Sequence, residues 1–143
     1  MNAIDPLFSG MRVSASGLAA ERVRIDVIAE NIANARTTRT PDGGPYRRKV
    51  VLFEALVDPS GRGSAPALGV ASARVVPDES SDFERVLDPS HPDAGPDGMV
   101  SYPNVNTVLE MADLITAMRA YEANLTAQES FVQMAERALD LAR

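Results

Sequence analysis

The amino-acid sequence predicts an α+β fold in which two long terminal helices form an antiparallel, coiled-coil-like hairpin, with a small β-rich insert between them. Apolar residues recur every seventh position near both ends of the chain, which is typical of helices that pack along their length. Short β-like runs and turn residues fill the middle. We therefore expect a helical segment at 1–40, a β-rich module at 41–106, and a second helical segment at 107–143 that packs against the first.

The last third of the chain carries the strongest periodicity. A heptad repeat keeps one stripe of a helix turned toward a partner. Thr107 and Glu110 have the spacing of a capping box, and Asn106 is an alternative N-cap. We expect a helix from Thr107 to Leu141, about 50 Å long. Its first heptad series consists of Met111, Met118, Leu125, Val132 and Leu139, and its second of Leu114, Tyr121, Gln128 and Ala135.

The first 40 residues carry a weaker heptad pattern. Asp5-Pro6 is a strong helix start, and the helix should fade near Asn34, before a cluster of threonines and Pro41. Gly10 and Gly17 weaken intrinsic helicity but let another helix approach closely. The second heptad series here is Ser14, Glu21 and Ile28. We expect helix seams, which also serve as subunit interfaces, in which Met11, Leu18, Ile25, Ile28 and Ile32 pack against Met111, Leu114, Met118, Tyr121, Leu125, Val132 and Leu139.

The middle of the chain reads as strands separated by turns. A turn at 41–45 precedes the first expected strand, at 46–57, and a flexible loop is expected near 58–66 because proline, glycine and serine gather there. The other expected strands cover 68–76, 83–87 and 99–102. This module is too small to be very stable alone.

Composition excludes several classes of function. A net charge of -6 argues against nucleic acid as the main partner, because phosphate binding needs concentrated lysine and arginine. The absence of cysteine excludes disulfides and thiolate metal sites. The chain opens without a basic region followed by an apolar one, so we expect no Sec-type signal peptide, and no run approaches the length of a membrane span.

The residues that carry chemistry in enzymes are sparse. His91 is the single histidine and has no evident nucleophile nearby. It could form a metal site with Asp88, Asp93 and Asp97, but the spacing matches neither an EF-hand nor a zinc module, and a solvated acidic loop shaped by prolines is the preferred interpretation. The basic triplet at 47–49 is typical of a solvated strand edge. We therefore expect no cofactor, no metal and no enzymatic activity.

Three sequence blocks resemble the axial proteins of the bacterial flagellum. The first, Asn31-Ile32-Ala33-Asn34, is similar to a signature shared by rod and hook proteins, and the other two resemble the proximal-rod members of that family. We expect Asn31 and Asn34 to bond backbone groups where the first helix ends. The second block contains Pro41, Gly43, Gly44, Pro45, Tyr46, Arg47 and Arg48, and the third contains His91, Pro92, Asp93, Gly98, Pro103, Asn104, Val105 and Asn106.

The resemblance implies a structural subunit of the flagellar basal-body proximal rod, located in the periplasm and exported by the flagellar type III apparatus without a cleaved signal peptide. Its terminal helices would polymerise into the hollow axial drive-shaft that transmits torque and lets export substrates pass. The implied neighbours are other copies of the chain, the sister rod subunits FlgB and FlgF, and the adaptor FliE. No nucleic acid and no small-molecule substrate are implied.

A different class of protein is an alternative. A stand-alone coiled-coil adaptor or signalling module, with the β insert as a recognition head, would also explain the heptad series. It would form a closed dimer and would leave two matched sequence blocks unexplained. Apolar positions outside the seams favour a helix hairpin with several neighbours; these are Val13, Val23, Val27, Ile115 and Phe131.

Overall fold

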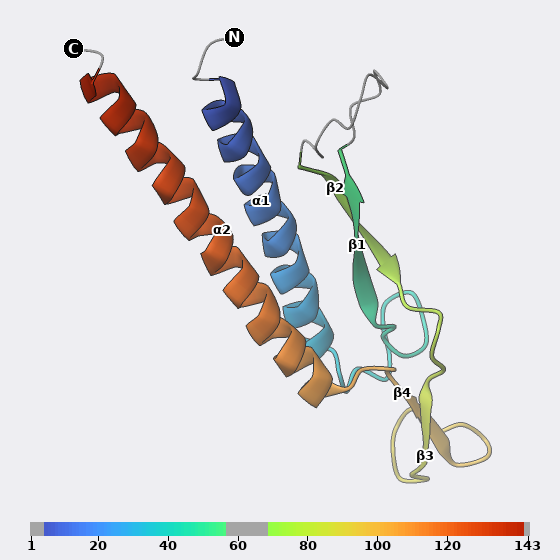
Figure 1. Cartoon of the computed structure of the whole chain (residues 1–143). Helices are drawn as coiled ribbons and strands as arrows, with labels where there is room; N and C mark the ends of the chain where they lie inside the picture. Colours follow the sequence, from blue (N-terminus) through green and yellow to red (C-terminus); the bar gives the residue numbers. More distant parts are fainter. Residues whose placement is uncertain (1–4, 57–68, 142–143) are drawn as a thin grey trace. The chain divides into compact units, whose positions relative to one another are not determined.

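A computed structural model describes residues 5–56 and 69–141, and Figure 1 shows their arrangement into two helices and four strands. The α+β class is confirmed. The loop expected near 58–66 lies outside the described residues. The elements, in chain order, are α1 (Asp5–Ala33), β1 (Lys49–Ala55), β2 (Val70–Pro77), β3 (Glu84–Leu87), β4 (Met99–Tyr102) and α2 (Thr107–Leu141).

The helices begin and end close to the predicted positions. α1 ends at Ala33, one residue before the expected limit, and α2 has the expected bounds. Asn106 is the N-cap of α2, because its Oδ1 accepts hydrogen bonds from the backbone N–H groups of Val108 and Leu109. The capping box expected from Thr107 and Glu110 is wrong, since the Glu110 carboxylate bonds other segments. Neither helix, over the residues described, is both long and apolar enough to cross a membrane.

The strands form two separate two-stranded sheets, β1–β2 and β3–β4 (Figure 1). In the first, Asp78 N donates to Arg48 O and Leu56 N donates to Gly69 O, so β1 and β2 run antiparallel. The second is antiparallel with Val86 opposite Val100. The expected strands are confirmed, although the first begins at Lys49 rather than at residue 46. Before Lys49, Tyr46 N donates to Thr37 O and Arg48 N donates to the Asn104 side chain instead of to a neighbouring strand.

The chain divides into two compact units, and each is described by itself. The first unit combines residues 1–24, 52–74 and 116–143, and the second combines 25–51 and 75–115. Within the first unit the helices are antiparallel neighbours: Gly10 lies against the Phe131 ring and Gly17 against the Asn124 side chain. A Cβ added at Gly10 would lie 2.7 Å from Phe131 Cζ, so the missing side chain makes room for the ring. The predicted close approach at the two glycines is confirmed.

The expected packing of the first heptad series of α2 against the chain's own first helix is not what the structure shows. These five side chains are 39–65% exposed. Ala117, Asn124 and Phe131, each one position earlier in the repeat, face inward instead: Ala117 is fully buried, and the other two contact α1. Since one residue turns a helix by about 100°, the two stripes lie side by side on α2. The exposed series is Met111, Met118, Leu125, Val132 and Leu139.

The other seam candidates are at least partly covered. Leu114 and Tyr121 of α2 are half-buried. On α1, Ile28 is buried, while Met11, Leu18, Ile25 and Ile32 are half-buried. The apolar core of the second unit consists of Val27, Ile28, Tyr46 and Val100, and two polar residues, Asn31 and Glu110, are buried with them.

Two glycines of the second unit allow the cost of a left-handed backbone conformation to be separated from the cost of crowding around a new side chain. Gly44 (φ 75°) and Gly98 (φ 71°) both adopt the left-handed region, where other residues cost about 1–2 kcal/mol. A Cβ at Gly44 would meet nothing within 4 Å, whereas one at Gly98 would lie 3.1 Å from Pro89 Cγ. We expect Gly98→Ala to lower the free energy of unfolding by about 1 kcal/mol more than Gly44→Ala does. Urea unfolding of the purified variants measures the difference, and equal losses would show that crowding at Gly98 has no effect.

Candidate functional site

Asn31 is one of two polar residues of the second unit that are only 1% exposed, and its amide makes four hydrogen bonds. Its Nδ2 donates to Lys49 O (2.8 Å) and to Glu110 Oε2 (3.0 Å). Its Oδ1 accepts from Tyr46 Oη (2.9 Å) and from Lys49 N (2.9 Å). Both donors and both acceptor positions are therefore used, and an aspartate of the same shape could not make the two donated bonds.

Glu110 and Arg48 form an ion pair beside this amide. Glu110 is 1% exposed, and its Oε1 accepts from Arg48 Nε at 2.7 Å. Arg48 Nη1 also donates to Asp78 Oδ2 at 3.0 Å, and Asp113 Oδ2 lies 3.9 Å from the guanidinium. Burial alone would lower the pKa of Arg48, but the hydrogen bonds to Glu110 and Asp78 outweigh it and raise the pKa. The buried Glu110 carboxylate is thus paired with a half-buried guanidinium.

Asp78 and Asn104 complete the connection to the turn after β2. Hydrogen bonds from the Ser80 hydroxyl and backbone, followed by the bond from Arg48, lower the pKa of Asp78. Asn104 Oδ1 accepts from Arg48 N at 2.9 Å, and its Nδ2 donates to Asp78 O and to the Ser81 backbone and hydroxyl. We call Asn31, Tyr46, Arg48, Asp78, Asn104 and Glu110 the polar junction; it joins the end of α1, the start of β1 and the start of α2.

The residues after α1 fold into a turn that leads to this junction. Asn34 Nδ2 donates to Glu30 O at 2.9 Å, and its Oδ1 accepts from Thr37 Oγ1 at 3.1 Å. Thr37 O then accepts from Tyr46 N at 2.9 Å. The prediction that Asn34 bonds backbone at the helix end is confirmed. Asn31 also bonds backbone, but that of Lys49 in β1.

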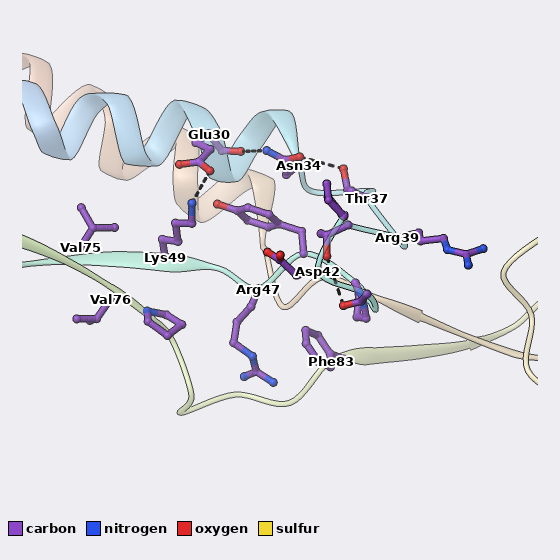
Figure 2. A pocket seen from close by; sticks show the side chains of 16 residues that line it. Glu30, Asn34, Thr37, Arg39, Asp42, Arg47, Lys49, Val75, Val76 and Phe83 are labelled. Atoms are coloured by element: carbon purple, nitrogen blue, oxygen red, sulfur yellow. Dashed lines mark hydrogen bonds and ion pairs between the residues drawn. The ribbon is translucent and has the colours of Figure 1, made fainter.

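A pocket borders the polar junction, and Figure 2 shows the side chains around it. Lys49 Nζ is ion-paired with Glu30 Oε1 at 2.6 Å, a contact drawn in Figure 2. Arg47 lies over the Phe83 ring, 4.3 Å from its centre, and donates to Asp78 O. With Arg48 bound to Glu110, each cation of the basic triplet has partners within the chain. This segment is therefore used internally and is not a free basic surface.

The acidic loop around His91 is also held by internal bonds. His91 Nδ1 accepts from Asp93 N, and Asp93 Oδ2 accepts from Thr38 Oγ1. Hydrogen bonds from Ser90 lower the pKa of Asp88, and the pKa of Asp97 is lowered by the Met99 backbone N–H and by Arg85. Within 5–56 and 69–141, no three carboxylate or imidazole groups lie close enough together to hold a metal ion.

The remaining motif residues shape turns around these contacts. Pro103 is buried, and Pro45, Val105 and Gly98 are half-buried. Pro41, Gly43, Gly44 and Pro92 are exposed in turns, and Ala33 is the exposed last residue of α1. The structure thus joins Asn31, Tyr46, Arg48 and Asn104 from all three blocks, whereas His91 and Asp93 lie outside the polar junction.

Sequence reasoning missed Asp78 altogether and assigned Glu110 only to a helix cap. Glu110 has one local signal: it begins the heptad stripe that continues with Ala117, Asn124 and Phe131. A glutamate at the head of an inward stripe indicates a buried charge that needs a cation. Asp78 offers no comparable signal, because its contacts depend on how the two strands before it pair.

Tyr46 makes the stability of the polar junction depend on pH in the alkaline range. Burial, followed by the nearby carboxylates of Glu30 and Glu110, raises the pKa of Tyr46 to about 12. The folded state therefore holds this proton more tightly than the unfolded state, and its stabilising contribution is complete below pH 10 and lost as pH rises toward 12. We expect the phenolate absorbance of wild type minus that of Tyr46→Phe to titrate near pH 12. A difference that titrates near pH 10 would contradict the burial of this hydroxyl.

Two protein-family models match the two ends of the chain, which contain residues of the polar junction. The family model "Flagella basal body rod protein" matches residues 11–39, and the model "Flagellar basal body rod FlgEFG protein C-terminal" matches 97–141. The flagellar basal-body rod protein FlgC of Borreliella burgdorferi is 44% identical over 93% of this chain and 95% of its own length. The chain belongs to the FlgC family of flagellar basal-body rod proteins. FlgC of Bacillus subtilis is 38% identical over 95% of this chain and 98% of its own length, and FlgC of Salmonella typhimurium is 36% identical over 90% and 92%.

Membership of the FlgC family confirms the resemblance seen in the three sequence blocks. The two matched regions contain Asn31 at one end of the chain and Asn104 and Glu110 at the other. These are residues that the fold brings together in the polar junction. Chemically, the junction consists of hydrogen bonds and ion pairs already satisfied within the chain, so its clearest role is to fix the geometry between α1, β1 and α2 in the second unit.

Proposed function

We propose that this chain is a structural subunit of the proximal rod of the bacterial flagellar basal body. In this role it polymerises through its terminal helices into a hollow shaft that transmits torque and lets export substrates pass. The names of its FlgC relatives, which it matches over nearly their whole length, support the rod assignment. The same names describe rod proteins, which supports a structural role without catalysis.

The observation that carries the polymerisation proposal is the exposed apolar stripe of α2. Large apolar side chains exposed in a row along a helix of 35 residues favour a second helix that covers them. The stripe beside it, which contains Asn124 and Phe131, already contacts α1 in the first unit. α2 therefore has one face for its own chain and another for a neighbour. The stripe consists of Met111, Met118, Leu125, Val132 and Leu139, with Ile115 at its edge.

If each copy covers the α2 stripe of the next with a different surface, the repeated contact can build a tubular assembly. When a surface of one copy binds a different surface of the next, the assembly stays open and grows into a helical filament. We propose that the half-buried positions of α1, Met11, Leu18, Ile25 and Ile32, lie in the same coiled-coil seams together with Leu114 and Tyr121. Many parallel seams would share a torsional load that single surface contacts could not resist.

The cellular setting follows from the same proposal. The subunit would be exported by the flagellar type III apparatus without a cleaved signal peptide and would assemble in the periplasm. Its neighbours would be other copies of itself, the rod subunits FlgB and FlgF, and the adaptor FliE. The segments 1–40, 41–106 and 107–143 would act as helical wall, outer module and helical wall.

Electron microscopy of basal bodies tests the proposal. Basal bodies purified from cells that lack this gene should have rings but no rod, and complementation with the wild-type gene should restore the rod. Intact rods in the deletion strain would exclude the proposed function and would favour a soluble coiled-coil adaptor.

A further inference from the structure

Glu21 places a carboxylate on the face of α1 that packs against α2. The first unit has an α1 stripe with spacings of four, three and four residues: Gly10, Ser14, Gly17 and Glu21. Gly10 and Gly17 contact α2, and Ser14 is buried. Residues four apart share a helix face, so Glu21 lies one turn beyond Gly17 on the face that packs against α2. Its side chain is 15% exposed.

One oxygen of the Glu21 carboxylate lacks the hydrogen bond that a buried charge requires. Among the described residues, its Oε2 is buried and accepts no hydrogen bond. Arg24 Nη1 lies 3.9 Å from Oε2, which gives some Coulomb attraction but is too long for a hydrogen bond. Buried carboxylate oxygens are normally satisfied, because leaving them unsatisfied costs the folded state their solvation. In the isolated chain, therefore, a buried carboxylate oxygen on the face between the two helices has no hydrogen-bond donor.

We propose that an arginine of a second copy of this chain donates hydrogen bonds to the Glu21 carboxylate when copies pack side by side. This inference rests on the proposed function. The chain offers suitable donors, since four helical arginines have no acidic partner in the part of the chain that the structure describes: Arg12, Arg22, Arg119 and Arg137. The Glu21 side chain keeps 15% of its surface exposed, and a guanidinium fork is the group that binds both oxygens of a carboxylate at once.

The variant Glu21→Gln separates a role in assembly from a role in folding. Glutamine keeps the shape and removes the charge, so urea unfolding of the purified chain should give a stability equal to or above that of wild type. In the deletion strain, however, we expect the fraction of basal bodies with a rod to fall about tenfold or more, as for loss of a hydrogen bond to a charged group. Arg24→Ala is the matched control and should assemble normally.

Either of two results would overturn the inference. Normal rods with Glu21→Gln would show that the carboxylate needs no partner in the assembly. A destabilised Glu21→Gln chain would show that Glu21 is satisfied within its own copy. If wild-type complementation itself restores no rod, the proposed function fails instead, so the two failures are distinguishable.

Cross-linking identifies the source of the donor. Because the chain has no cysteine, Glu21→Cys can be combined in turn with Arg12→Cys, Arg22→Cys, Arg119→Cys and Arg137→Cys without competing thiols. Because Glu21→Cys also removes the carboxylate, alone it should lower rod formation as Glu21→Gln does. We expect the one pair whose cysteines meet between copies to restore rods and to give a disulfide-linked dimer in the purified basal bodies. The absence of a dimer with all four pairs would exclude a second copy as the donor.

Discussion

Cells that carry Leu125→Glu in place of the wild-type chain are expected to build no rod and not to swim, while the variant accumulates as a folded protein. Leu125 is 41% exposed on α2, so a glutamate there is solvated in the isolated chain and should change its stability by less than about 0.5 kcal/mol. In an assembled seam the same carboxylate would be covered without a cation, at a cost of several times that amount. Electron microscopy of basal bodies and circular dichroism of the purified variant measure the two effects.

Ala123→Glu is the matched control for this prediction. Ala123 is also exposed on α2, two residues earlier, and therefore lies about 200° around the helix from Leu125. It adds the same charge outside the apolar stripe, so its rods should be normal. Normal rods with Leu125→Glu would exclude the stripe as a subunit interface, and loss of rods with both variants would indicate a general effect of charge on α2.

Glu110→Ala is expected to have the largest effect on stability. Removal of this carboxylate leaves the Arg48 guanidinium without its shortest bond and one Asn31 donor without an acceptor. Breaking a buried pair from one side costs about 3 kcal/mol, at the lower end of the usual range because Arg48 keeps its bond to Asp78. Urea unfolding of the purified chain measures the loss.

Asp113 provides the control, because its carboxylate also lies near Arg48, at 3.9 Å, but its side chain is 48% exposed. Asp113→Ala should cost less than about 0.5 kcal/mol, as is usual for surface ion pairs. Similar losses for both variants would mean that the Arg48–Glu110 pair is not buried as described.

The helices could be predicted from sequence because their signals are local. The Asp5-Pro6 start and the Asn106 cap act within a single turn, and the apolar heptad repeats indicated two long helices, which are antiparallel neighbours in the first unit. The phase of the inward stripe could not be predicted from apolarity. Opposite Gly10 and Gly17 the neighbouring helix lies close to backbone, so Asn124 fits at the contact, while the more apolar methionines and leucines remain free for other partners.

The polar junction could be predicted only in part. The sequence blocks contained Asn31, Tyr46, Arg48 and Asn104, but nothing local shows that Asn31 bonds a residue 79 positions away. Such contacts depend on how β1 and α2 approach the end of α1, and that geometry results from tertiary packing. Glu110 was interpreted as part of a cap because three-residue spacing is visible in a sequence, whereas the position of Arg48 in space is not.

The Asn31 amide also protects an edge of the first sheet. Backbone groups of a strand alternate in direction, so Arg48 O faces β2 while the N–H and C=O of Lys49 point away from it, where Asn31 bonds both. The side chain thus occupies the place of an additional strand. In a hairpin that exposes Leu52 and Phe53, an open edge would invite strand pairing between unassembled copies. Asn31 therefore closes this edge of β1, at Lys49, to pairing with a further strand.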